Sequence, residues 1–165
     1  MSIQFAGDCL RVLSHSLLAV KPQEGCALLI GNEKQSSYFH EENVWQIKLI
    51  WPCCNAWNIK ALNFPTPMKI INIKHENKIS KENRFAIDPR EQIHAQRWAR
   101  KKNMQILGSA HSHPNGEAFP SLIDQSWSFD SGLSVILGKS GNMRAWWITK
   151  NQTVPPAEVA ILGLK

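Results

Sequence analysis

Residues 104–124 read MQILGSAHSHPNGEAFPSLID, and the rest of the chain can be interpreted outward from this stretch. Met104–Ala110 is short, largely apolar and ends in small residues, which predicts a buried strand. In an extended chain, residues two apart point to the same side. We therefore expect His111 and His113 to face one point at the end of this strand, while Ser112 faces away.

A second element supplies a carboxylate. Pro120 and the S-x-x-D run that follows it have the pattern of a helix start, with Ser121 at the N-cap and Asp124 in the first turn. Two histidines and one aspartate make three protein ligands, which leave a fourth tetrahedral position open for water. This is the pattern of a catalytic zinc site, because structural zinc sites are usually closed by four protein ligands.

Each part of the pattern also has a simpler interpretation. An isolated His-x-His pair is more often a surface or hydrogen-bonded core feature than a metal site, and S-x-x-D alone is more often a capping box. Capping does not require a preceding H-x-H-P, however, and core histidines do not require a downstream Pro-Ser and Asp. The combination favours a metal site formed by His111, His113 and Asp124.

The segment resembles the signature of the JAMM, or MPN-plus, zinc metallopeptidases. In that family H-[S/T]-H-P is followed by P-S-x-x-D, and a glutamate lies far upstream. The upstream match is Pro22–Gly31, PQEGCALLIG, which is similar to the family pattern P-x-E-x-C-G-L-L-x-G. Phe85–Pro89 and Ile106–Gly108 are similar to the small bacterial members. Ala27 departs from a frequent Gly, and Ser109-Ala110 from a frequent aromatic, but neither position is a ligand.

The resemblance implies one zinc ion per chain, held by His111, His113 and Asp124. It implies Glu24 as the general base and Ser121 as a hydrogen-bond donor to the tetrahedral intermediate. Taken alone, Glu24 would be a solvated glutamate before a strand, and Ser121 would only cap a helix. The chain has no histidine or cysteine after Asp124, so we expect no second metal ion.

The resemblance also implies an activity and a partner. The activity is hydrolysis of the amide or isopeptide bond that follows the C-terminal glycine of a ubiquitin-like protein. In small bacterial relatives, the implied substrate is a sulfur-carrier protein with a Gly-Gly tail. The alternative is a non-catalytic MPN-type protein-binding module, but modules of that kind lack the ligands that this chain retains. A homo-oligomer is left open.

Composition limits the class of protein. With 165 residues, 43% of them hydrophobic, we expect a single domain over residues 1–165. The N-terminal stretch carries charged side chains and is neither a signal peptide nor a membrane span. Four cysteines without a C-x-x-C pair favour reduced thiols in a cytoplasmic protein and disfavour a zinc deaminase. The net charge of +6 permits an acidic partner, but without an RNA-binding aromatic motif we do not expect nucleic-acid binding.

Local patterns predict the other elements. Apolar residues from Leu10 to Val20 follow helical spacing, and Asp88-Pro89 has the pattern of a second helix start. A strand is expected near Val44–Trp51, and Leu133–Leu137 with Met143–Thr149 predicts a closing hairpin. We expect a mixed α/β fold with a central, mainly antiparallel sheet flanked by helices. The resemblance implies a JAMM/MPN-like, cytidine-deaminase-like core.

Residues 58–83 are longer than a typical connection between elements. They contain Pro65-Thr66-Pro67 and the apolar run Met68–Ile73. We interpret them as an insertion. A flap that grips the substrate and an insertion without a role have equal weight, since surface loops tolerate additions.

Overall fold

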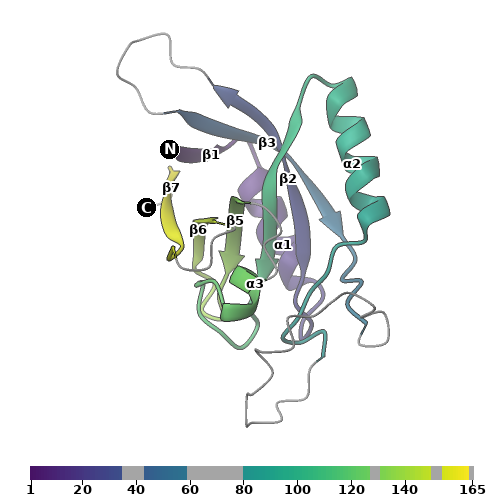
Figure 1. The fold of residues 1–165 in the computed structure, drawn as a ribbon, viewed down its shortest axis with the longest axis vertical. Coiled ribbons are helices and arrows are strands. Elements are labelled where there is room, and N and C mark those ends of the chain that lie inside the picture. Colours follow the sequence, from purple (N-terminus) through teal and green to yellow (C-terminus); the bar gives the residue numbers. More distant parts are fainter. Residues whose placement is uncertain (35–42, 59–79, 127–130, 150–153, 164–165) are drawn as a thin grey trace.

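The sheet closes on itself. The computed structural model describes residues 1–34, 43–58, 80–126, 131–149 and 154–163. Within these residues the helices are α1 (Cys9–Leu18), α2 (Pro89–Lys101) and α3 (Leu122–Ser126). The strands are β1 (Ser2–Phe5), β2 (Cys26–Lys34), β3 (Val44–Cys53), β4 (Gln105–Ser112), β5 (Gly132–Leu137), β6 (Met143–Ile148) and β7 (Ala157–Leu162). They form a barrel in the order β1-β3-β2-β4-β5-β6-β7, which β1 and β7 close (Figure 1).

The expected central, mainly antiparallel sheet flanked by helices is wrong, because the sheet is a closed mixed barrel. The sequence patterns predicted neither β1 nor β7, which run parallel to each other with Ser2 beside Ala160. β1 also runs parallel to β3, and β4 runs parallel to β5. A strand as short as β1 has too few residues to show an alternating pattern, and both of its partners are distant in sequence. The hairpin of β5 and β6 is confirmed, but it does not end the sheet.

The two faces of the sheet are covered by different helices. On the inner face, buried side chains from every strand of the barrel pack with α1 in one hydrophobic core. On the outer face, α2 lies over β2 and β4 (Figure 1). Its small residues Ala95 and Ala99 pack there in a second hydrophobic cluster. Strand β2 buries side chains on both faces of the sheet, since Leu29 belongs to the inner core and Leu28 to the outer cluster. Its near-continuous apolar sequence follows from this double burial.

The helices begin where the sequence predicted them. α1 is confirmed, with Leu13 and Leu17 fully buried. α2 begins with Asp88 as its N-cap, whose side chain accepts a hydrogen bond from the backbone N–H of Arg90 at 2.8 Å. Proline at the first position and this cap together explain why the helix starts there.

Residues 59–79, most of the expected insertion, lie outside the described residues. The chain is described again from Ser80, and the carbonyl of Lys81 accepts a hydrogen bond from the backbone N–H of Glu24 at 2.7 Å. This contact attaches the end of the insertion to the start of β2. In the described part of the chain, no helix is both long enough and apolar enough to cross a membrane.

Gly31 tests the close packing of the barrel. It follows a register shift in β2, and a Cβ atom added there would lie 1.9 Å from the carbonyl oxygen of Gln46. We expect Gly31→Ala to lower the free energy of unfolding by at least about 1–3 kcal/mol, the usual cost of overpacking. Urea denaturation measures this. Gly132→Ala is the matched control, because an added Cβ there meets nothing within 4 Å. Equal stability of the two variants would contradict the close contact between β2 and β3.

Candidate metal centre

The end of β4 presents two histidines on one face of the sheet. His111 and Ser112 are the last strand residues, and His113 follows at once. Ser112 points to the other face, where its hydroxyl accepts a hydrogen bond from the backbone N–H of Gly25 at 2.9 Å and lies 3.4 Å from the carbonyl oxygen of Leu17. The alternation predicted from the sequence is confirmed. Ser112 anchors the strand end to α1 and to the start of β2.

Helix α3 supplies the carboxylate. Ser121 precedes the helix, and Asp124 lies in its first turn. The backbone N–H of Ser121 donates to Asp124 Oδ2 at 2.6 Å, and the backbone N–H of Asp124 donates to Ser121 Oγ at 3.2 Å. This reciprocal pair is a capping box, which confirms the predicted helix start. The cap also fixes the direction of the Asp124 side chain.

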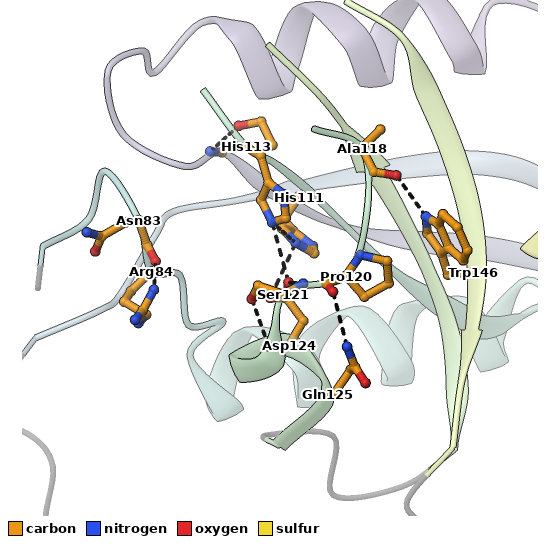
Figure 2. A network of polar contacts seen from close by, with 12 residues as sticks. Asn83, Arg84, His111, His113, Ala118, Pro120, Ser121, Asp124, Gln125 and Trp146 are labelled. Carbon is orange, nitrogen blue, oxygen red and sulfur yellow. Dashed lines mark hydrogen bonds and ion pairs between the residues drawn. The ribbon is translucent and has the colours of Figure 1, made fainter. Parts of the chain in front are cut away.

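Three donor atoms from β4 and α3 converge on one point (Figure 2). His111 Nε2 and His113 Nε2 are 3.0 Å apart. Asp124 Oδ1 lies 3.4 Å from His111 Nε2, and Asp124 Oδ2 lies 3.4 Å from His113 Nε2. These two distances end on different carboxylate oxygens, but ligand atoms taken one from each residue all lie within 4.8 Å of one another. In a tetrahedral zinc site with bonds of about 2.0–2.1 Å, neighbouring ligand atoms are about 3.3–3.4 Å apart. The three side chains could therefore hold one metal ion, with a fourth position left for water or substrate.

Contacts behind the histidines fix their rings. His113 Nδ1 lies 2.9 Å from the carbonyl oxygen of Glu117, so it donates there and leaves Nε2 free as a ligand. The His111 ring is 1% exposed and stacks on Phe85, with ring centroids 4.4 Å apart and an interplanar angle of 22°. These contacts restrict both imidazoles to orientations in which Nε2 faces Asp124.

The loop between His113 and α3 is held by its own carbonyl groups. The indole N–H of Trp146, on β6, donates to the carbonyl of Ala118 at 3.0 Å, and Gln125 Nε2 donates to the carbonyl of Pro120 at 3.1 Å (Figure 2). Sequence reasoning missed Trp146, because nothing near it in the chain marks its partner. Its hydrogen bond joins the loop that carries Ser121 to the barrel.

The electrostatics favour an ionised aspartate. Burial alone would raise the pKa of Asp124, but His111, His113 and Ser121 together hold it well below its usual range. Burial would lower the pKa of His113, yet the Asp124 carboxylate raises it above the ordinary value. The negative charge of Asp124 thus favours the protonated form of the His113 imidazole. A cation would take the place of such a proton.

Glu24 lies beside these three residues, although it comes from the other end of the chain. β2 pairs with β4 in antiparallel register, with Cys26 opposite His111, and the backbone N–H of Ser112 donates to the carbonyl of Gly25 at 3.0 Å. Continuing this register places Glu24 opposite His113. Glu24 is only 6% exposed, and burial raises its pKa to about 7, with smaller opposing effects of His113 and Asp124.

Two further residues beside Glu24 escaped the sequence analysis. Arg84 is half-buried, and its charge interacts with both Glu24 and Asp124. Asn55 Nδ2 donates to the carbonyl of Glu24 at 3.0 Å. Neither residue belongs to a recognisable motif, so only the folded chain reveals them. A buried carboxylate, a cation and three candidate ligands therefore share one site at the ends of β2 and β4.

The barrel and this site define a protein with a candidate two-histidine, one-aspartate metal centre. The family model of prokaryotic homologs of the JAB domain matches residues 7–149. The chain belongs to this family, as the resemblance in its motifs suggested. None of the curated proteins compared with the chain matches it significantly.

Solved structures share the fold. A protein from Desulfitobacterium hafniense, solved in solution, is similar with a TM-score of 0.71 and 21% identity, covering 97% of this chain and 91% of that one. A protein from Salinibacter ruber is similar with a TM-score of 0.58 and 16% identity, covering 98% and 93%. A JAB1/MPN domain protein from Archaeoglobus fulgidus has a TM-score of 0.46 and 15% identity, covering 98% and 97%. At these identities, the first two similarities show the fold alone.

The candidate ligands can be tested by metal binding. We expect purified protein to bind about one zinc ion per chain and Asp124→Asn to weaken zinc binding by more than about 100-fold. Replacing a residue that only hydrogen-bonds to a ligand already lowers metal affinity by about 10–100-fold. The amide retains an oxygen that can accept from Ser121, so the fold should persist. Elemental analysis and competition with a chelating dye measure this. Glu117→Gln is the control, since this nearby side chain pairs with Lys139 at the surface. Equal zinc affinity in both variants would contradict the ligand assignment.

Proposed function

We propose that this protein is a zinc-dependent hydrolase that cleaves an amide or isopeptide bond following the C-terminal glycine of a ubiquitin-like or sulfur-carrier protein. The observation that carries the proposal is the convergence of His111, His113 and Asp124, whose possible ligand atoms lie within 4.8 Å of one another, with the buried carboxylate of Glu24 beside them. Two imidazole nitrogens and one carboxylate oxygen suit zinc. Membership of the JAB family supports a hydrolase, and the substrate class is drawn from the resemblance.

A zinc ion would be held by His111, His113 and Asp124, where it would supply Lewis acidity to the reaction. Glu24 accepts a proton from the attacking water while the new C–O bond forms. It then delivers this proton to the leaving nitrogen as the C–N bond breaks. Burial raises the pKa of the Glu24 carboxyl, and a buried carboxylate with a raised pKa is suited both to accepting and to releasing a proton.

Ser121 can serve two roles at once. Its hydroxyl oxygen accepts the hydrogen bond of the helix cap, from the backbone N–H of Asp124. A serine hydroxyl also has one proton to donate. We propose that this proton is donated to the substrate oxygen that becomes negatively charged during attack. Stabilising the charge that develops on this oxygen often contributes more to the rate of acyl transfer than any other single effect.

The general base can be separated from the ligands. We expect Glu24→Gln to keep one zinc ion per chain but to lower kcat by about 10²–10⁴, the usual size of general-base effects. Turnover and metal content are measured on the same preparation. Glu82→Gln is the control, since this glutamate lies nearby but is exposed. If Glu24→Gln turns over as fast as the wild type, Glu24 is not the base.

The substrate class can be tested with intact proteins. Sulfur carriers and ubiquitin-like proteins encoded by the same genome are prepared with short extensions after the terminal Gly-Gly. We expect the zinc-loaded protein to remove the extension and leave the Gly-Gly end, which mass spectrometry detects as a single defined loss of mass. Carriers whose last glycine is replaced by a bulkier residue serve as controls. If unrelated peptides are cleaved while every carrier stays intact, the proposed amide hydrolysis stands and the proposed substrate class is wrong. No hydrolysis of any amide would favour the non-catalytic binding module.

A further inference from the structure

Asn55 connects three separate segments of the chain at the edge of the site. It lies just after β3 and is half-buried. Its Nδ2 atom donates to the carbonyl of Glu24 at 3.0 Å and to that of Arg84 at 2.9 Å, with the carbonyl of Lys81 at 3.4 Å. Its Oδ1 atom accepts from the backbone N–H groups of Trp57 and Ala86, at 3.0 and 3.3 Å.

These hydrogen bonds use the whole capacity of a carboxamide, which has two N–H donors and one oxygen with two lone pairs. Every partner is a backbone group, so the contacts fix the path of the chain itself. The backbone of Glu24 is held on both sides, since its N–H donates to Lys81 and its carbonyl accepts from Asn55. Leucine would fill a similar volume but offer none of these bonds, and aspartate would turn an oxygen toward the three carbonyl groups.

The same side chain also fixes the segment after the insertion. Asn55 binds the backbone of Arg84 and Ala86, and the backbone N–H of Ala56 donates to the carbonyl of Ala86 at 2.9 Å. Phe85 lies between Arg84 and Ala86 in the sequence, and its ring stacks on His111. Asn55 is therefore linked by backbone contacts to the proposed base and, through Phe85, to the edge of the metal centre.

We infer that Asn55 is a positioning residue that holds Glu24 at the place where it can exchange a proton with the attacking water. This inference rests on the proposed function, in which Glu24 is the general base. A misplacement of a reacting group by about 1 Å can cost about 10²-fold in rate. The three candidate ligands belong to β4, its extension and α3, and among the described residues none of them forms a hydrogen bond with the Asn55 side chain. Loss of the side chain should therefore impair proton transfer more than metal binding.

A double-mutant cycle tests the coupling. We expect Asn55→Ala to lower kcat by about 10–100-fold, with the zinc content still about one per chain. In the Glu24→Gln background the same change should have no further effect, because the base that Asn55 positions is already lost. Asn142→Ala, an exposed asparagine in the turn between β5 and β6, is the matched control. Independent, multiplicative effects of the two substitutions would overturn the inference. An unchanged kcat in Glu24→Gln would instead remove the proposed base.

Amide hydrogen exchange of the metal-free protein gives a second readout that needs no activity. The Ala86 amide donates to Asn55, and the Glu24 amide donates to the Lys81 carbonyl, which also accepts from Asn55. In Asn55→Ala we expect both amides to exchange at least about tenfold faster, while amides hydrogen-bonded between β4 and β5 keep wild-type rates. Asn55→Asp keeps the acceptor for Ala86 but loses the donor to Glu24. In this variant the Ala86 amide should keep its slow exchange, the Glu24 amide should exchange faster, and kcat should fall as it does in Asn55→Ala. Unchanged exchange of Glu24 in both variants would overturn the inference, whether or not the protein hydrolyses any substrate.

Discussion

The antiparallel pairing of β2 with β4 is the constraint on which the site depends. Its register sets Cys26 opposite His111, and the hydrogen bonds between Gly25 and Ser112 extend that register by one step. A slip of one residue would turn the site side chains of one strand toward the opposite face. Glu24 would then point toward α1, away from His113. The pairing thus brings together residues from opposite parts of the sequence, and the anchoring of Ser112 on the inner face makes the alignment difficult to change.

The site buries charged groups at an electrostatic cost, although the barrel around it is well packed. Two carboxylates, those of Glu24 and Asp124, are largely removed from water, and such burial costs free energy unless each charge is compensated. Asp124 is compensated by the histidines and by the cap, whereas Glu24 is compensated less fully and its pKa rises. The hydrophobic cluster on the inner face does not share this conflict, because the side chains that form it are apolar. Departures from ordinary packing rules of this kind are expected where a protein keeps a function.

Sequence patterns predicted that the three candidate ligands lie together, but they did not predict that the sheet closes. His111 and His113 are two residues apart at the end of one strand, and Ser121 and Asp124 lie at the start of one helix, so local geometry fixes how each pair is oriented. The contribution of Asn55 depends on how three distant segments meet, and no local period encodes that. The closure of the barrel was missed for the same reason: β1 is short, and it pairs with strands far along the chain. Features set by residues close in sequence could be predicted from the sequence, whereas features set by tertiary contacts could not.

The capping box of α3 has a thermodynamic consequence. A helix of five residues is too short to persist by itself in water, so its order must come from its cap and its tertiary contacts. The same Asp124 carboxylate closes the cap with Ser121 and faces the two histidines. Any cation that these side chains bind would therefore stabilise the helix as well as the centre, and part of its apparent affinity would be free energy of local folding. Fraying of this single turn and departure of the ion would be one coupled equilibrium.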